Sequence, residues 1–190
     1  ISLRNLALIV LLAGGLHLYL YVFKGQGDDY QYDTKPLVKK RSTFTFNNQV
    51  RDNIFWTCIS GVPIWSAYEV IMMWALANNY LPFIAGEGDY LWIALVIFLI
   101  PIWETFYFYL IHRLLHWKPL YRLAHSVHHR NTNIGPWSGF SMHPVEHIFY
   151  LGSVLVHFIV LAHPLIIIYH LQYFALSAVT THSGFEGLFA

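Results

Sequence analysis

Five of the twelve histidines lie within residues 112–129, and their spacing places them on shared helix faces. The first two are four residues apart, so on an α-helix both imidazoles leave the same side. The other three stand at positions i, i+3 and i+4 and share a face in the same way. In chain order they are His112, His116, His125, His128 and His129.

A break between the two groups lets them face each other. Pro119 disfavours helical geometry at Lys118 and is suited to the first turn of a new helix. We therefore expect the chain to turn there and to bring two histidine-bearing faces together.

Clustered neutral imidazoles are typical ligands of a transition metal such as iron, zinc or copper. A single histidine on an apolar helix is more often a core or interface residue. We interpret His17, His157, His163 and His170 in that way when each is taken alone. The dense group at 112–129 instead predicts a metal site.

The pattern H-x3-H followed by H-x2-HH resembles the fatty acid hydroxylase and sterol desaturase superfamily of integral-membrane diiron oxygenases. The resemblance continues through HPVEH at 143–147 and HSGF at 182–185, which look like segments of the sterol-desaturase-like branch. It covers roughly residues 103–187. Superfamily members carry one more H-x2-HH box after the HSG segment, whereas this sequence stops at Ala190. We expect the polypeptide to continue beyond that residue.

The resemblance implies two iron ions that bind O2, accept two electrons and attack an unactivated C–H bond of a lipid. The product is a hydroxylated or desaturated sterol, fatty-acyl chain or related lipid. The implied electron donor is a cytoplasmic protein of the cytochrome b5-like or ferredoxin-like kind. No catalytic residue is implied beyond the metal ligands. Matching the boxes gives the ligand set His112, His116, His125, His128, His129 and His182, with His143 as a further candidate.

Several neighbouring residues have two interpretations. His147 is more simply a residue that orients the helix after it than a ligand. Each ligating imidazole needs an acceptor for its second N–H, and the candidates are Glu146, Asn131, Asn133 and Ser141. Residues that either line a substrate route or anchor the chain at the membrane interface are Trp137, Gly139 and Phe140.

The composition is that of a membrane protein. Of the 190 residues, which fit a single domain, 56% are hydrophobic and only 11% are charged. The 7 Trp, 13 Tyr and 14 Phe are the side chains that anchor proteins at bilayer interfaces. A net charge of +1 gives no electrostatic reason to expect a nucleic-acid partner, and the single cysteine, Cys58, excludes an internal disulfide.

Apolar segments long enough to cross a bilayer predict an all-α polytopic bundle of about five transmembrane helices. The region 112–147 carries the histidine boxes on an interfacial helix. His163-Pro164 divides the last apolar stretch into two helices. Glu104 is interpreted as a helix–helix hydrogen-bond acceptor. The expected spans are 5–23, 54–81, 90–115, 146–162 and 164–181.

The distribution of basic residues predicts the orientation. Lysine and arginine gather in 24–51 and 113–130, whereas the loop 78–89, which contains Glu87, has neither. The positive-inside rule therefore places both histidine boxes in the cytoplasm. The sequence does not indicate which membrane this is.

Two other functions are compatible with parts of the sequence. A superfamily member without activity would serve as a structural or accessory subunit of a membrane complex, and the downstream histidine box distinguishes the two cases. A haem held by His157 and His170 would leave the box histidines without a role. Carotenoid hydroxylases and ether-lipid monooxygenases use similar boxes, so the substrate stays open.

Overall fold

The computed structural model describes residues 1–84 and 89–187, and these residues form helices and loops without a named strand. Part of the loop predicted over 78–89, including Glu87, and the last three residues lie outside them. Four helical segments are long and apolar enough to cross a membrane. They are Ser2–Val22, Gln49–Ala77, Tyr90–Leu115 and Pro164–Thr181. The predicted all-α membrane bundle is confirmed.

Two of the four segments contain π-helical turns. The first consists of α1 (Ser2–Ile9), η1 (Val10–Gly14), α2 (Gly15–His17) and η2 (Leu18–Val22). The second consists of α3 (Gln49–Trp56), η3 (Thr57–Gly61) and α4 (Val62–Ala77). The third and fourth are the single helices α5 (Tyr90–Leu115) and α9 (Pro164–Thr181).

The segment expected as a span over 146–162 is not one long helix. It begins as α8 (Pro144–Leu151) and continues as the 3-10 helix η6 (Gly152–Phe158). The predicted turn at His163-Pro164 is present. There the side chain of His163 accepts a hydrogen bond from the backbone N–H of Leu165 at 3.2 Å and caps α9.

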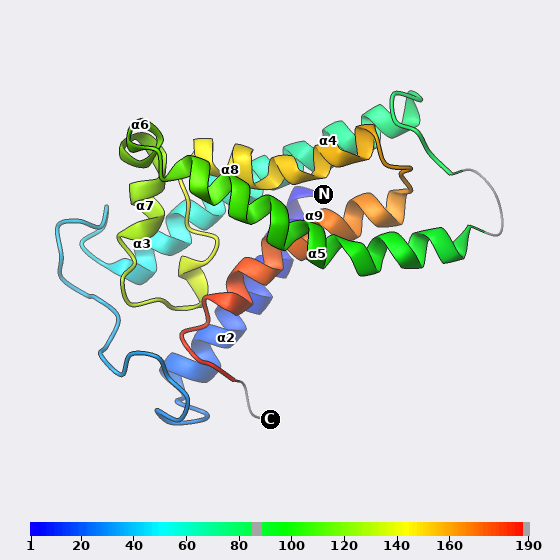
Figure 1. Cartoon of the computed structure of the whole chain (residues 1–190). Coiled ribbons are helices and arrows are strands. Elements are labelled where there is room, and N and C mark those ends of the chain that lie inside the picture. Colours follow the sequence, from blue (N-terminus) through cyan, green and yellow to red (C-terminus); the bar gives the residue numbers. More distant parts are fainter. Residues whose placement is uncertain (85–88, 188–190) are drawn as a thin grey trace.

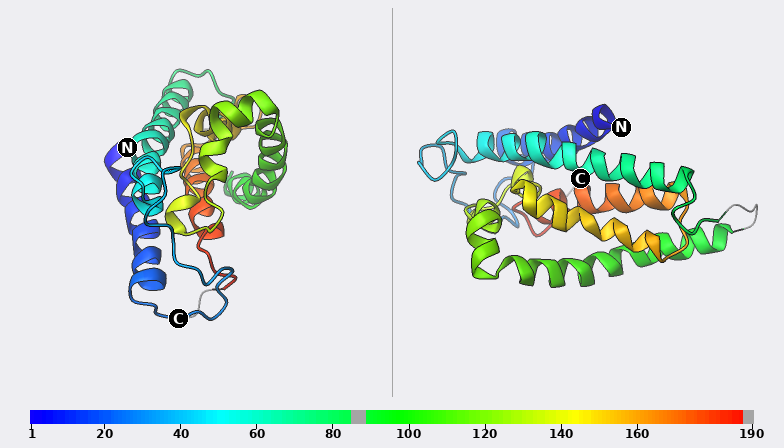
Figure 2. Two further views of the ribbon diagram at one scale, coloured as in Figure 1. Left: turned by 90° about the vertical axis from the view of Figure 1, so that its left-hand side faces the viewer. Right: turned by 90° about the horizontal axis from the view of Figure 1, so that it is seen from above.

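Helix α4 packs beside α8, and α9 contacts both α4 and α5 and crosses α5 at an angle (Figures 1 and 2). Fully buried Trp65, Phe174 and Leu171 belong to the core between them. Large apolar side chains of α5 point outward instead, as with Leu91 at 82% and Phe98 at 69% exposure. Such a surface is unfavourable in water and suits hydrocarbon. The chain is an integral membrane protein.

A buried ion pair ties α3 to the segment after the second histidine box. Asp52 is fully buried, and its Oδ2 lies 2.6 Å from Nη2 of Arg130, whose side chain is 18% exposed. The other carboxylate oxygen accepts a hydrogen bond from the backbone N–H of Thr45 at 2.9 Å. The pair therefore fixes the residue that directly follows His129.

We expect Asp52→Asn to destabilise the protein, because it leaves the Arg130 guanidinium without a counter-charge. Breaking a buried pair costs about 3–5 kcal/mol. This corresponds to a fall in melting temperature of roughly 10 °C in detergent. The control Asp33→Asn removes the carboxylate of a surface pair, 4.0 Å from Lys35, and should change little. Equal melting temperatures for the two variants would contradict this role of Asp52.

Candidate metal centre

The two histidine boxes lie on consecutive helices joined by a sharp turn. The last turn of α5 carries His112, and His116 is its C-terminal cap. Trp117 is extended, with φ −60° and ψ 128°, and the next helix starts at Lys118. The chain then runs through α6 (Lys118–Leu120), η4 (Tyr121–His125) and α7 (Ser126–His129). The predicted break is present, one residue earlier than expected.

Four box histidines converge on one point. Each of His112, His116, His125 and His129 offers a ring nitrogen, and these nitrogens all lie within 4.8 Å of one another. Nε2 of His116 is 3.1 Å from Nε2 of His112, and Nε2 of His129 is 2.9 Å from Nε2 of His125. Two ligands about 2.1 Å from a metal and at right angles to each other are about 3.0 Å apart. The arrangement therefore fits one transition-metal ion.

The protonation state of the cluster imidazoles also favours metal binding. Burial, and then the neighbouring His116, lowers the pKa of His125 to about 4. Burial, and then His125 and His116, lowers the pKa of His129 to about 4. Both imidazoles are therefore neutral at physiological pH, which leaves a lone pair for a metal.

A carboxylate orients one of these ligands. Nδ1 of His125 lies 2.7 Å from Oε1 of Glu146 on α8, and both side chains are buried. Burial raises the pKa of Glu146 to about 8, so in the metal-free chain this buried pair shares one proton. With that proton on Nδ1, the Glu146 oxygen accepts the hydrogen bond and the lone pair of Nε2 points at the cluster, which is the form that binds a metal. Glu146 was among the predicted acceptors, and the structure confirms this contact.

His128 and His182 form a second group beside the first. Their ring centroids are 5.2 Å apart. Nδ1 of His182 donates to the carbonyl of Ala178 at 3.0 Å, and Nδ1 of His128 lies 3.4 Å from the carbonyl of Ser141. Each Nε2 is then left with its lone pair. Burial lowers the pKa of both imidazoles, followed for His128 by the neighbouring His182.

The remaining candidates have other contacts. Nδ1 of His143 accepts a hydrogen bond from the backbone N–H of Val145 at 3.3 Å and caps α8, so the four-histidine cluster does not include it. Its role as a ligand stays a prediction. His147 lies 2.8 Å from the hydroxyl of Ser60 and thereby ties α8 to η3. The amide of Asn131 donates to the backbone carbonyl of His128 at 3.1 Å, and that of Asn133 donates to the backbone carbonyl of Lys35 at 2.7 Å. The side-chain oxygen of Asn131 accepts from Gln49 and not from a box imidazole.

A cavity of about 310 Å³ adjoins both histidine groups. Its polar end includes Glu104, which accepts a hydrogen bond from Ser177 at 2.5 Å, as a helix–helix acceptor should, and lies 3.3 Å from the hydroxyl of Tyr150. Gly139 lines it, whereas Trp137 and Phe140 pack in the core. The lining residues next to the imidazoles of His112, His128 and His182 include Phe108, Met142, Tyr150 and Thr181.

The nitrogens of His157 and His170 are 3.0 Å apart and bond to each other directly. Two axial ligands of a haem iron would lie about 4 Å apart with the iron between them, at about 2 Å from each. The haem interpretation therefore does not fit this pair.

The sequence can now be compared with known proteins. Residues 96–189, which contain every histidine of both groups, match the fatty acid hydroxylase family. This chain belongs to the fatty acid hydroxylase and sterol desaturase superfamily. It is 31% identical over 98 residues to a Delta(7)-sterol 5(6)-desaturase of Eremothecium gossypii, a match that covers 50% of this chain. The same match covers only 27% of that relative's length. No solved structure matches the chain.

The sequence did not predict which apolar residues line the cavity in this superfamily member. Helical spacing could have indicated one of them, because Phe108 precedes His112 by one helical turn, and their ring centroids are 5.0 Å apart. Met142 and Tyr150 had none, because they reach the cavity from α8 and the loop before it.

Gly139 is where the loop after the second box passes closest to α9. A Cβ atom there would overlap the backbone carbonyl of Ala178 and lie 3.0 Å from Cβ of His182. We expect Gly139→Ala to displace this loop and to cost about 1–3 kcal/mol of stability. Gly15→Ala, where an added Cβ meets nothing within 4 Å, is the matched control. Melting temperatures in detergent test this, and an unchanged value for Gly139→Ala would refute the close approach.

Proposed function

We propose that this protein is a membrane oxygenase that hydroxylates or desaturates a lipid with O2 and two electrons at a pair of iron ions. The observation that carries the proposal is the placement of two imidazole groups against one largely apolar cavity. Superfamily membership supports the same chemistry.

The chain's own residues divide the ligands between the two ions. His112, His116, His125 and His129 would hold one of them. His128 and His182 would contribute to the other, together with the histidine box that superfamily members carry further along the chain. Neutral nitrogen ligands suit iron, and the bound ions would supply O2 activation and C–H oxidation.

The cavity walls have a positioning role. Phe108, Met142 and the ring of Tyr150 exclude water and hold an apolar part of the substrate beside the imidazoles. The hydroxyl of Tyr150 donates to the carbonyl of Phe174 at 2.7 Å, which keeps the ring fixed between α8 and α9. The apolar character of the cavity walls favours a lipid, such as a sterol or fatty-acyl chain, over a polar metabolite.

The proposed orientation places both histidine groups on the cytoplasmic side of the membrane, where the basic loops lie. A lipid would reach the cavity sideways from the bilayer. Electrons would come from a cytoplasmic donor of the cytochrome b5-like or ferredoxin-like kind.

The test is iron analysis and product analysis on the full-length protein in lipid nanodiscs. Iron is measured by elemental analysis. Protein is then supplied with a reductant, labelled O2 and a panel of sterols and fatty-acyl lipids. Anaerobic and iron-stripped samples are the controls. Hydroxylated or desaturated product only with iron and O2 is the expected result. A folded protein with neither iron nor product would refute the proposal and favour the accessory-subunit alternative.

A further inference from the structure

A second cavity, of about 560 Å³, lies away from the two histidine groups, where the first two membrane segments meet the loop that joins them. Its lining includes Leu20 and Val22 at the end of the first segment and Val50 and Arg51 at the start of the second. It shares no lining residue with the histidine-lined cavity. Because both segments end on this side, the cavity lies at the level of lipid headgroups.

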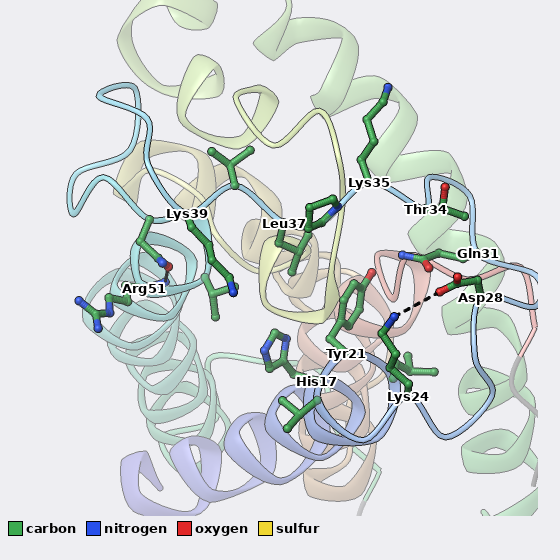
Figure 3. A pocket seen from close by; sticks show the side chains of 16 residues that line it. His17, Tyr21, Lys24, Asp28, Gln31, Thr34, Lys35, Leu37, Lys39 and Arg51 are labelled. Atoms are coloured by element: carbon green, nitrogen blue, oxygen red, sulfur yellow. Dashed lines mark hydrogen bonds and ion pairs between the residues drawn. The ribbon is translucent and has the colours of Figure 1, made fainter.

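The charges around this cavity are mostly positive. Four cationic residues line it, Lys24, Lys35, Lys39 and Arg51, against one acidic residue, Asp28. Lys24 lies 3.8 Å from Asp28 (Figure 3). Lys35 lies 4.0 Å from Asp33, which is outside the cavity lining. Within residues 1–84 and 89–187, the side chains of Lys39 and Arg51 have no carboxylate partner.

A buried polar atom also lacks a partner here. His17 projects from α2 toward the loop and stacks on Tyr21, with ring centroids 5.5 Å apart (Figure 3). Its Nδ1 is buried and makes no hydrogen bond within the described part of the chain. Unpaired buried polar atoms are unfavourable, so this nitrogen is suited to a ligand that enters the cavity.

The remaining lining is apolar. Leu20, Val22, Leu37, Val38 and Val50 form much of the wall. A ligand that matches both the cationic and the aliphatic residues of the lining carries a phosphate, which contacts the cations and His17, and a hydrocarbon portion, which packs against the aliphatic side chains. Clustered cations at a membrane surface attract anionic lipids in this way.

We propose that this cavity binds the headgroup of an anionic phospholipid. The phosphate lies among Lys39, Arg51 and His17, and the glycerol and upper acyl chains lie against the aliphatic wall. The site is also connected to the metal centre. The hydroxyl of Tyr21 is 3.0 Å from the backbone oxygens of both Ile134 and Ser183, the residue after His182. Tyr21 therefore links this cavity to the segment that carries His182.

The experiment measures binding of phosphatidic acid to delipidated full-length protein in detergent, with phosphatidylcholine as the neutral lipid. The test variant is Lys39→Gln/Arg51→Gln. The matched control is Lys40→Gln/Arg41→Gln, which removes the same charge from exposed neighbours outside the cavity lining. One cationic contact contributes about fivefold to anionic-lipid binding, so we expect the test variant to bind about thirtyfold more weakly and the control to bind as wild type does.

Two further measurements separate the site from general surface charge. His17→Phe keeps an aromatic ring on Tyr21 but removes Nδ1, and should weaken phosphatidic acid binding several-fold without a change in net charge. Competition with soluble glycerol 3-phosphate should be weak, because it lacks the acyl chains. Equal losses in the two double variants, or competition by glycerol 3-phosphate at the concentration at which the lipid binds, would overturn the proposal.

Discussion

Replacing His125 and His129 together by alanine is expected to remove about half of the iron from the full-length protein and to abolish lipid oxidation. These two imidazoles are half of the four-histidine cluster, and their Nε2 atoms are only 2.9 Å apart. Two remaining histidines do not complete the coordination of a transition metal. Elemental analysis after size-exclusion chromatography measures the loss, and product analysis measures the activity.

Two comparison variants make the result specific. His128→Ala/His182→Ala should remove the other ion and leave the four-histidine cluster intact. His163→Asn changes a histidine that caps α9 and keeps a side-chain acceptor for the N–H of Leu165, so iron and activity should persist. If His125→Ala/His129→Ala retained all of its iron, the four-histidine cluster would not be a metal site.

Local sequence pattern predicted the parts of this site that depend on helix geometry. Spacing alone places His112 and His116 on one side of α5, because helical periodicity fixes which residues share a face. Pro119 likewise predicted the turn between the two boxes, which the structure places at Trp117. Apolar length predicted the spans that coincide with α5 and α9.

Helix periodicity does not predict contacts between residues that are far apart in the sequence. Which four of the box histidines converge depends on how η4 and α7 fold back against the end of α5. The pairing of His128 with His182 joins residues 54 positions apart, and the family resemblance alone brought His182 into the ligand set. Periodicity also gave no sign that residues 146–162 divide into α8 and a 3-10 helix, since both are rich in apolar residues.

The loop between the first two spans illustrates the same limit. From its sequence it is a polar connection. In the structure, Gln49 at the start of α3 bonds to the side chain of Asn131 at 3.2 Å and to the backbone oxygen of Asn133. The loop's own Lys35 carbonyl accepts a hydrogen bond from Asn133 at 2.7 Å. The loop therefore helps to fix the segment after the second histidine box, which its composition alone does not indicate.

Glu146→Ala is expected to weaken iron binding by about 10- to 100-fold, although Glu146 is not itself one of the proposed ligands. Its carboxylate holds Nδ1 of His125 at 2.7 Å and so fixes the tautomer that presents Nε2 to the cluster. Without it, His125 can rotate or place its proton on Nε2, where the proton blocks the metal. Competition with a chelator of known affinity measures the change.

The conservative variant Glu146→Gln tests whether Glu146 acts by positioning His125 or only by stabilising the fold. Glu146→Gln keeps an oxygen that accepts from Nδ1 and nearly the same volume in this buried position, so it should lose less affinity than alanine. Glu186→Ala removes an exposed carboxylate and should bind iron as wild type does. Melting temperatures show whether each variant is folded. A folded Glu146→Ala protein with wild-type iron affinity would show that His125 needs no acceptor, and the role assigned to Glu146 would be wrong.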